Sequence, residues 1–143
     1  MSQGWTPPSF SYRTFAAFFE DLAGRGALPA RLDLSAVAGY PPSVGPQLLD
    51  LLERMGLLDA DGTVAPGPMR AVVSGRTKRR DFLRAWAREA YAEQLRLVEA
   101  GAPEEELHAS FAAFGYRSHK VPRAVRFFHE LRADLGPLTR VRP

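Results

Sequence analysis

The chain has 143 residues, of which 45% are hydrophobic, and a net charge of +3 at pH 7; this is enough chain to bury one core or two very small ones. Cysteine is absent, which excludes disulfides, thiol catalysis and cysteine-ligated metals. No apolar run approaches 18 residues and no basic start precedes an apolar segment, so we expect neither membrane insertion nor secretion, and a cytoplasmic location.

The N-terminal segment predicts a proline-stiffened lead-in followed by a helix that starts after Ser9 or Ser11. Trp5 in such a lead-in is expected to be an anchor packed against the domain. Four apolar residues then recur with helical spacing, which indicates a buried face rather than a base-stacking platform; they are Phe15, Phe18, Phe19 and Leu22.

Residues 33–66 have the element order of a winged helix-turn-helix. Asp33 is predicted to cap a short helix, and Gly39 to end it as a left-handed residue. Ser43 is predicted to cap a second helix with Pro46 in its first turn. Two helices joined by a tight turn are typical of this motif, whose second helix is the one presented to the major groove.

A short β-hairpin is predicted directly after the second helix. Leu57-Leu58 and Thr63-Val64 flank Asp59-Ala60-Asp61-Gly62, a turn that supplies a glycine where positive φ is needed. This hairpin would be the wing. Residues 69–73 fit either a last wing strand or the start of a helix.

A basic block precedes a long helix predicted from Thr77 to Ala100. Its members lie at the helix N-terminus, where each cation opposes the helix dipole by about 0.3 to 1 kcal/mol; they are Arg76, Lys78, Arg79 and Arg80. A phosphate backbone would give that arrangement a purpose. The alternative is that these side chains simply point into water.

A second copy of the helix-turn-helix pattern is predicted near the C-terminus. Pro103 and residues 104–106, three glutamates, favour a helix start there rather than a metal site. Gly115-Tyr116 is then followed by Pro122 at the offset that separates Gly39-Tyr40 from Pro46. The apolar positions also correspond: Leu49, Leu51, Leu52 and Met55 fall opposite Val125, Phe127, Phe128 and Leu131.

The two copies differ in charge. The first offers nearly neutral or acidic side chains to solvent, namely Ser43, Gln47, Asp50, Glu53 and Arg54. The second offers mostly basic ones, namely Arg117, Ser118, His119, Lys120, Arg123 and Arg126. Such side chains at the start and along one side of a recognition helix contact phosphates and base edges; the alternative is a solvated arginine-rich surface. Arg140 and Arg142 in the tail are predicted to be frayed or to add a backbone contact.

The distribution of charge carries more weight than the number of arginines. The chain has only two lysines and no asparagine or isoleucine, which indicates a GC-rich genome that favours arginine. The basic charge is nevertheless clustered. Residues 70–88 hold 7 basic and 1 acidic side chains, and residues 117–143 hold 7 and 2.

No catalytic pattern is found. The three histidines, His108, His119 and His129, lack zinc-site spacing, and neither a phosphate-binding glycine loop nor a nucleophile elbow is present. We therefore predict no enzyme, no metal and no cofactor.

The opening W-T-P-P-S-F-S-Y-R-T-F-x-x-F, the segment L-P-A-R-L-D, the motif G-L-L-D-x-D-G and a late F-F pair resemble an uncharacterised prokaryotic family, a domain of unknown function. The resemblance extends over most of the chain. It implies a cytoplasmic bacterial or archaeal protein and transfers no activity or functional residues.

Together these patterns predict a mostly α fold that is winged helix-turn-helix-like, with two helix-turn-helix units and a small β-hairpin wing. The predicted division is an N-terminal winged-helix-like unit of residues 1–70 and a second unit of residues 71–143, made of the long helix and the C-terminal helix-turn-helix-like unit. The alternative is that the two form one compact domain. The leading prediction is a protein that binds double-stranded DNA as a regulator or a nucleoid- or mobile-element-associated factor. The predicted contact residues are Arg76, Lys78, Arg79, Arg80, Arg117, His119, Lys120, Arg123 and Arg126.

The alternative prediction is a non-enzymatic protein interaction or dimerisation module, in which the neutral first unit and the aromatic faces bind a partner or a second copy. The two predictions differ in where the basic blocks lie. One shared face favours DNA, whereas opposite faces or pairing with residues 104–106 favours protein interaction.

Overall fold

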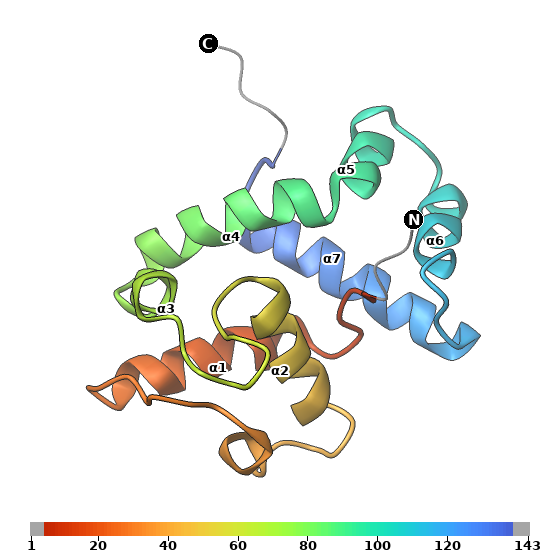
Figure 1. The fold of residues 1–143 in the computed structure, drawn as a ribbon. Helices are drawn as coiled ribbons and strands as arrows, with labels where there is room; N and C mark the ends of the chain where they lie inside the picture. Colours follow the sequence, from red (N-terminus) through yellow and green to blue (C-terminus); the bar gives the residue numbers. More distant parts are fainter. Residues whose placement is uncertain (1–4, 139–143) are drawn as a thin grey trace. The chain divides into compact units, whose positions relative to one another are not determined.

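The computed structural model describes residues 5–138 and is mostly helical (Figure 1), as predicted. The described residues form seven α-helices and two 3-10 helices: α1 (Tyr12–Gly24), η1 (Leu34–Val37), α2 (Gly45–Arg54), α3 (Pro66–Val73), α4 (Arg76–Ala90), α5 (Ala92–Glu99), α6 (Glu104–Ala112), η2 (Ser118–Lys120) and α7 (Val121–Leu135). None of these helices is both long and apolar enough to span a bilayer. The predicted tail contacts of Arg140 and Arg142 lie outside the described residues.

The chain forms two compact units, which differ from the predicted division. Residues 13–82 make one unit, here the central unit, and residues 1–12 with 83–143 make the other, the terminal unit. The predicted boundary after residue 70 falls inside α3. The lead-in belongs with the C-terminal helices because Phe10 and Tyr12 pack edge-on against Phe127 of α7, with ring centroids 5.8 and 5.4 Å apart.

The core of the central unit is built on the predicted aromatic face of α1. All four residues of that face are at most 2% exposed, as expected for an amphipathic helix: Phe15, Phe18, Phe19 and Leu22. α2 adds Leu48, Leu51 and Leu52 to the same core. η1 lies close against α2 because Gly45 has no side chain, and a Cβ there would be 2.9 Å from Val37 Cγ2.

The turn between η1 and α2 is closed by the backbone rather than by the predicted glycine and serine. Asp33 caps η1 as predicted, accepting from the Ser35 amide at 3.1 Å and the Ser35 hydroxyl at 2.6 Å. Gly39 does not have positive φ, so that prediction was wrong. Ser43 does not cap α2 either, because the residue before the helix is Val44, which already has helical backbone angles.

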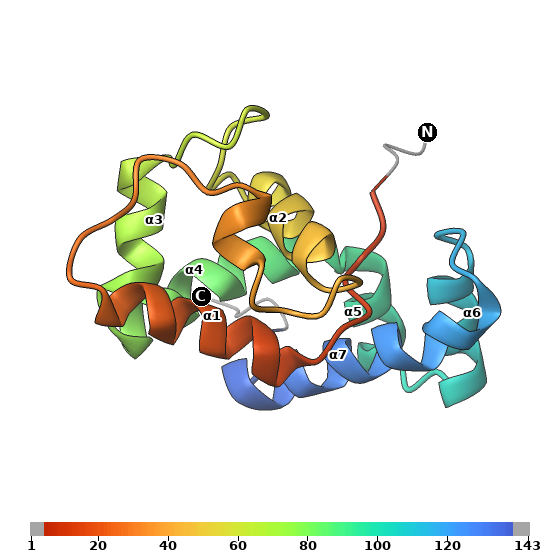
Figure 2. The same ribbon diagram turned by 90° about the horizontal axis from the view of Figure 1, so that it is seen from below.

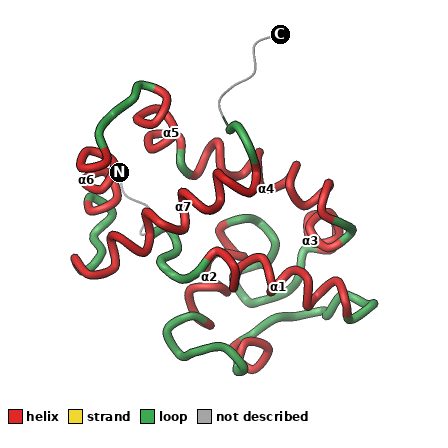
Figure 3. Tube along the Cα trace, turned by 180° about the vertical axis from the view of Figure 1, so that it is seen from behind, coloured by secondary structure: helices red, strands yellow, loops and turns green. Residues whose placement is uncertain are grey.

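The predicted β-hairpin wing is not formed as strands in the described residues (Figure 3). Instead, two isolated antiparallel bridges pair Arg31 with Thr63 and Leu58 with Val64. The predicted turn is present, with Gly62 at φ +90°. The pairing stops there because Pro66 starts α3, which also makes residues 69–73 helical rather than a last wing strand.

We expect Gly62→Ala to lower the free energy of unfolding by roughly 2 kcal/mol, since it forces an unfavourable positive φ on alanine. The new Cβ would also lie 2.7 Å from the Leu32 carbonyl oxygen. Gly39→Ala is the matched control, because nothing lies within 4 Å and its φ is not positive; it should be neutral or stabilise by about 0.4 to 1 kcal/mol. Urea unfolding measures both, and equal effects would contradict the assigned backbone.

The predicted long helix of the terminal unit is broken. Tyr91, with φ −113° and ψ 29°, separates α4 from α5, and the bend is visible in Figure 1. Tyr91 is fully buried, with ring centroids 5.0 Å from Phe128, 5.8 Å from Trp86 and 6.1 Å from Phe111. The break between α4 and α5 therefore lies at the residue that packs into this aromatic cluster.

Two helices of the terminal unit pack against α6. Both α5 and α7 contact it (Figure 2). Trp5 of the lead-in lies edge-on against Trp86 at 6.4 Å and Phe114 at 6.5 Å, so its predicted role as an anchor is confirmed.

Candidate nucleic-acid interface

The nine predicted contact residues are divided between the two units. Arg76, Lys78, Arg79 and Arg80 belong to the central unit, on α4. Arg117, His119, Lys120, Arg123 and Arg126 belong to the terminal unit, on η2, α7 and the residue before them.

Arg79 is a structural residue rather than a surface cation. Only 7% of it is exposed. Its Nε donates to the Val72 carbonyl at 2.8 Å, its Nη1 donates to Glu20 at 2.7 Å, and its guanidinium lies 5.8 Å from the centre of the Phe19 ring. The guanidinium joins α1, α3 and α4 within the central unit, so Arg79 is not available to contact nucleic acid as predicted.

We expect Arg79→Ala to lower the free energy of unfolding by about 1 to 3 kcal/mol, since it removes hydrogen bonds and ring packing together. The comparison is Arg76→Ala with Lys78→Ala, which removes two exposed charges from the same helix turn. That pair should change stability by no more than about 0.5 kcal/mol. Thermal unfolding by circular dichroism would contradict the assignment if both changes were equally small.

Two members of the basic block on α4 face solvent. Arg76 and Lys78 are exposed, whereas Arg80 is half-buried and its Nε is shielded from solvent. The first turn of α4 contains no acidic residue. The central unit therefore offers a small cationic patch at the start of α4 rather than the four-residue block that was predicted.

The basic segment of the terminal unit is held in place by a well-anchored turn. Gly115 has φ +96° and follows α6. The Tyr116 hydroxyl then donates to the Pro7 carbonyl, which ties the turn to the lead-in. η2 follows, and Pro122 occupies the first turn of α7, where its missing amide proton costs no hydrogen bond.

Most of the predicted side chains on this segment are accessible. Arg117, His119, Arg123 and Arg126 are exposed and Lys120 is half-buried. Arg126 has 80% of its side chain exposed and lies 3.5 Å from Glu130, an exposed pair that contributes little. The chain has no acidic residue between positions 107 and 129.

The local field at this site is positive. α7 has no side-chain cap at its N-terminus and no acidic residue in its first turn. The helix dipole therefore adds to the charge of the nearby arginines and favours an anion. The basic segment is in this respect unlike the N-terminus of α6, where three glutamates offset the dipole.

The first glutamate of α6 pairs with two histidines rather than with the basic segment. Glu104 lies 2.9 Å from His129 Nε2 and 3.5 Å from His108 Nε2. The hydrogen bond with His129 is the largest cause that lowers the pKa of Glu104. These contacts could not be read from the sequence, and neither involves the basic segment, so pairing with residues 104–106 does not account for its arginines.

The predicted repeat is present in the second helices but not in the first. α2 and α7 each begin one residue before a proline and lack a side-chain cap. Three of the four predicted apolar pairs are buried in both copies, namely Leu51, Leu52 and Met55 with Phe127, Phe128 and Leu131. The fourth pair differs, because Leu49 is half-buried whereas Val125 is buried. The preceding helices differ, because η1 is a short 3-10 helix and α6 is an α-helix.

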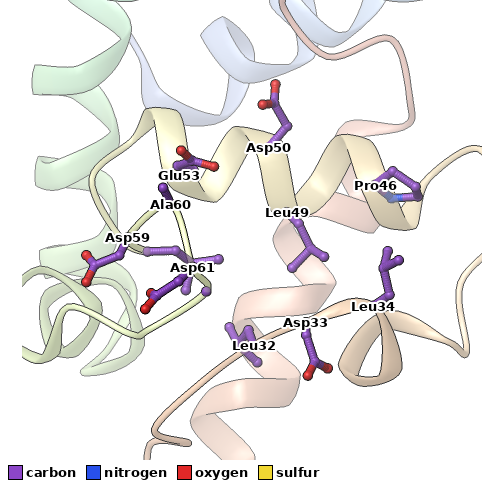
Figure 4. A pocket seen from close by; sticks show the side chains of 12 residues that line it. Leu32, Asp33, Leu34, Pro46, Leu49, Asp50, Glu53, Asp59, Ala60 and Asp61 are labelled. Carbon is purple, nitrogen blue, oxygen red and sulfur yellow. The ribbon is translucent and has the colours of Figure 1, made fainter.

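An acidic groove with a volume of about 380 Å³ lies beside α2 (Figure 4) and was not predicted from the sequence. Its charged lining is entirely acidic: Asp33, Asp50, Glu53, Asp59 and Asp61. A signal was available, since five of the six charged residues between positions 32 and 61 are acidic and only Arg54 is basic. The helix expected to read DNA in the central unit thus borders negative charge.

Comparison of the chain with protein-family models, curated proteins and solved structures gave no match in any of the three. The resemblance to a domain of unknown function stays a prediction.

Proposed function

We propose that this protein is a non-enzymatic DNA-binding protein that contacts the phosphates of duplex DNA through the terminal unit, in the prokaryotic cytoplasm. The observation that carries the proposal is the accessible basic segment at the start of α7, which has no acidic residue within it. Cations on an exposed helix N-terminus match a polyanion. Its contact residues are Arg117, His119, Lys120, Arg123 and Arg126.

The fold proposal that goes with this function is a reduced winged helix in the central unit. The order α1, bridge residue Arg31, η1, α2, and the bridge pair Leu58 and Val64 corresponds to helix, strand, two helices and hairpin. Its wing is reduced to single bridges. The acidic surroundings of α2 support a role other than DNA contact for this unit, since phosphates would be repelled there.

Salt titration of binding to a random DNA duplex, followed by fluorescence anisotropy, tests the proposal. For four phosphate contacts we expect log affinity to fall against log salt with a slope of roughly −3.6, that is −0.9 per contact. Absence of binding at low salt would overturn the proposal. A steep slope would justify selection of a preferred sequence and a role in regulation or DNA organisation.

A second function, protein interaction through the central unit, is favoured by one observation. The groove beside α2 combines apolar and acidic side chains on a face that the DNA proposal leaves unused. This function does not exclude the first, because it uses a different unit of the chain.

A further inference from the structure

The groove beside α2 has an apolar surface as well as acidic groups. Six apolar residues line it: Leu32, Leu34, Pro46, Leu49, Leu58 and Ala60. Leu34 is 63% exposed and is the one large hydrophobic side chain of the described residues that is exposed. The groove has a volume of about 380 Å³, which lies within the range of pockets that hold ligands, about 300 to 1,000 Å³.

Figure 4 shows how the side chains are distributed along the groove. Glu53, Asp59 and Asp61 lie together at the end that is next to the 59–62 turn, and Leu34 and Pro46 lie at the other end, with Asp33 beside Leu34. Leu49 lies between the two ends, and the Asp50 carboxylate points away from Leu49. A ligand that fills the groove would therefore need a cationic group at one end and an apolar group at the other.

The acidic residues fall into two classes. Asp33 and Asp61 stabilise local turns: Asp33 accepts from the hydroxyl and the amide of Ser35, and Asp61 accepts from the amide of Thr63. The Ser35 hydroxyl is the largest cause that lowers the pKa of Asp33, and the Thr63 amide is the largest cause that lowers the pKa of Asp61. The other three carboxylates form neither an ion pair nor a side-chain hydrogen bond within residues 5–138; they are Asp50, Glu53 and Asp59. These three are open to a cationic ligand.

We propose that this groove binds a basic segment of a partner protein, with arginine or lysine against Glu53, Asp59 and Asp50 and an apolar side chain against Leu34 and Leu49. Charge complementarity selects this occupant, because no basic side chain lines the groove and nucleic acid would be repelled. The proposal is independent of DNA binding by the terminal unit. The protein would then join DNA on one unit to a basic partner on the other.

The test is binding of a short fluorescein-labelled peptide of alternating arginine and leucine to the full chain, by anisotropy at low and moderate salt. The variant Asp50→Asn, Glu53→Gln, Asp59→Asn should weaken binding by about tenfold, since three exposed ion pairs are lost. Leu34→Ser should also weaken it by about tenfold. Peptides with glutamate for arginine, or serine for leucine, should bind weakly or not at all.

The matched control removes three exposed charges from the terminal unit: Glu89→Gln, Glu93→Gln, Glu99→Gln. It should leave peptide affinity within about twofold of the unchanged protein. Equal loss in both triple variants would overturn the proposal, because attraction would then be set by net charge. Amide NMR shifts on peptide addition should centre on residues 32–34, 46–53 and 58–62, and shifts centred elsewhere would also overturn it.

Two further readouts separate the alternatives. Sedimentation of the unchanged protein should show a monomer at assay concentration; self-association that the groove variant abolishes would identify a second copy as the occupant and overturn the choice of a partner. Duplex DNA affinity of the groove variant should be retained or increased. Loss of peptide binding with DNA binding intact is therefore a different result from failure of the DNA proposal.

Discussion

Replacing Arg123 and Arg126 together with alanine is expected to weaken duplex binding on the order of 10²-fold at 50 mM salt, and to reduce the slope of log affinity against log salt by about 1.8. The physical reason is counterion release. Each lost phosphate contact leaves one more condensed cation on the DNA, so the loss is large at low salt and small near 1 M. Anisotropy titrations at several salt concentrations measure both the affinity and the slope.

The matched control is Arg88→Ala with Arg96→Ala. It removes the same charge from the same unit, at exposed positions in the last turns of α4 and α5. If Arg123 and Arg126 contact DNA phosphates directly, the control variant should retain most of the slope of log affinity against log salt. Equal losses would mean that the duplex responds to total charge, and the assigned interface would be wrong.

Folding does not confound this comparison. Arg123 and Arg126 are exposed. Within residues 5–138 the two arginines form one ion pair, between Arg126 and Glu130, which is weak because water surrounds it. We expect the stability of the double variant to stay within about 0.5 kcal/mol of the unchanged protein. A loss of DNA binding would therefore report on the interface itself.

Some local patterns in the sequence predicted local structure, whereas the left-handed Gly39, the Ser43 cap and the hairpin strands were not formed. The helical spacing of Phe15, Phe18, Phe19 and Leu22 identified a buried face, and all four are buried. Residue preferences at helix starts likewise placed Pro46 in the first turn of a helix and Asp33 at a cap. In each successful case the residues that determine the local structure lie within a few positions of one another, so the sequence pattern alone is enough to predict it.

Tertiary placement could not be read in this way. Arg79 belongs to a basic run, but Glu20, 59 residues away, and the Phe19 ring convert it into a buried structural group. Tyr91 lies in a segment with continuous helical spacing, yet its contacts with the aromatic cluster coincide with a helix break. The acidic groove likewise needs η1, α2 and a distant turn to come together.

Between pH 10 and pH 12 we expect the free energy of unfolding to fall by about 2 to 3 kcal/mol through Tyr91 alone. Burial is the main cause that raises the pKa of Tyr91 well above its ordinary value, followed by the electrostatic influence of Tyr116. Burial also raises the pKa of Tyr116 and that of Tyr40, which is less buried than Tyr116. Partly exposed Tyr116 should add a smaller loss.

The sign follows from which state binds the proton. In the folded protein the buried Tyr91 hydroxyl stays protonated, whereas in the unfolded chain it ionises near pH 10. Above that pH the unfolded state has fewer bound protons, so the free energy of unfolding falls by about 1.4 kcal/mol per pH unit for a fully buried tyrosine. The loss ends only when the pH reaches the folded-state pKa.

Tyr91→Phe and Tyr116→Phe should act in opposite directions at pH 7. The Tyr91 hydroxyl is buried without a hydrogen-bond partner in the described structure, so its removal should stabilise by about 1 kcal/mol. The Tyr116 hydroxyl donates to the Pro7 carbonyl, so its removal should cost about 1 kcal/mol. Urea unfolding followed by circular dichroism gives both values.

At alkaline pH the larger effect belongs to Tyr91→Phe, which should remove about 1.4 kcal/mol per pH unit from the slope between pH 10 and pH 12. Tyr116→Phe should reduce the slope by less, because part of that ring contacts solvent. A variant at Tyr91 that destabilises at pH 7 and leaves the alkaline slope unchanged would contradict the assignment. Its hydroxyl would then have a partner, such as a buried water, that offsets the cost of burial.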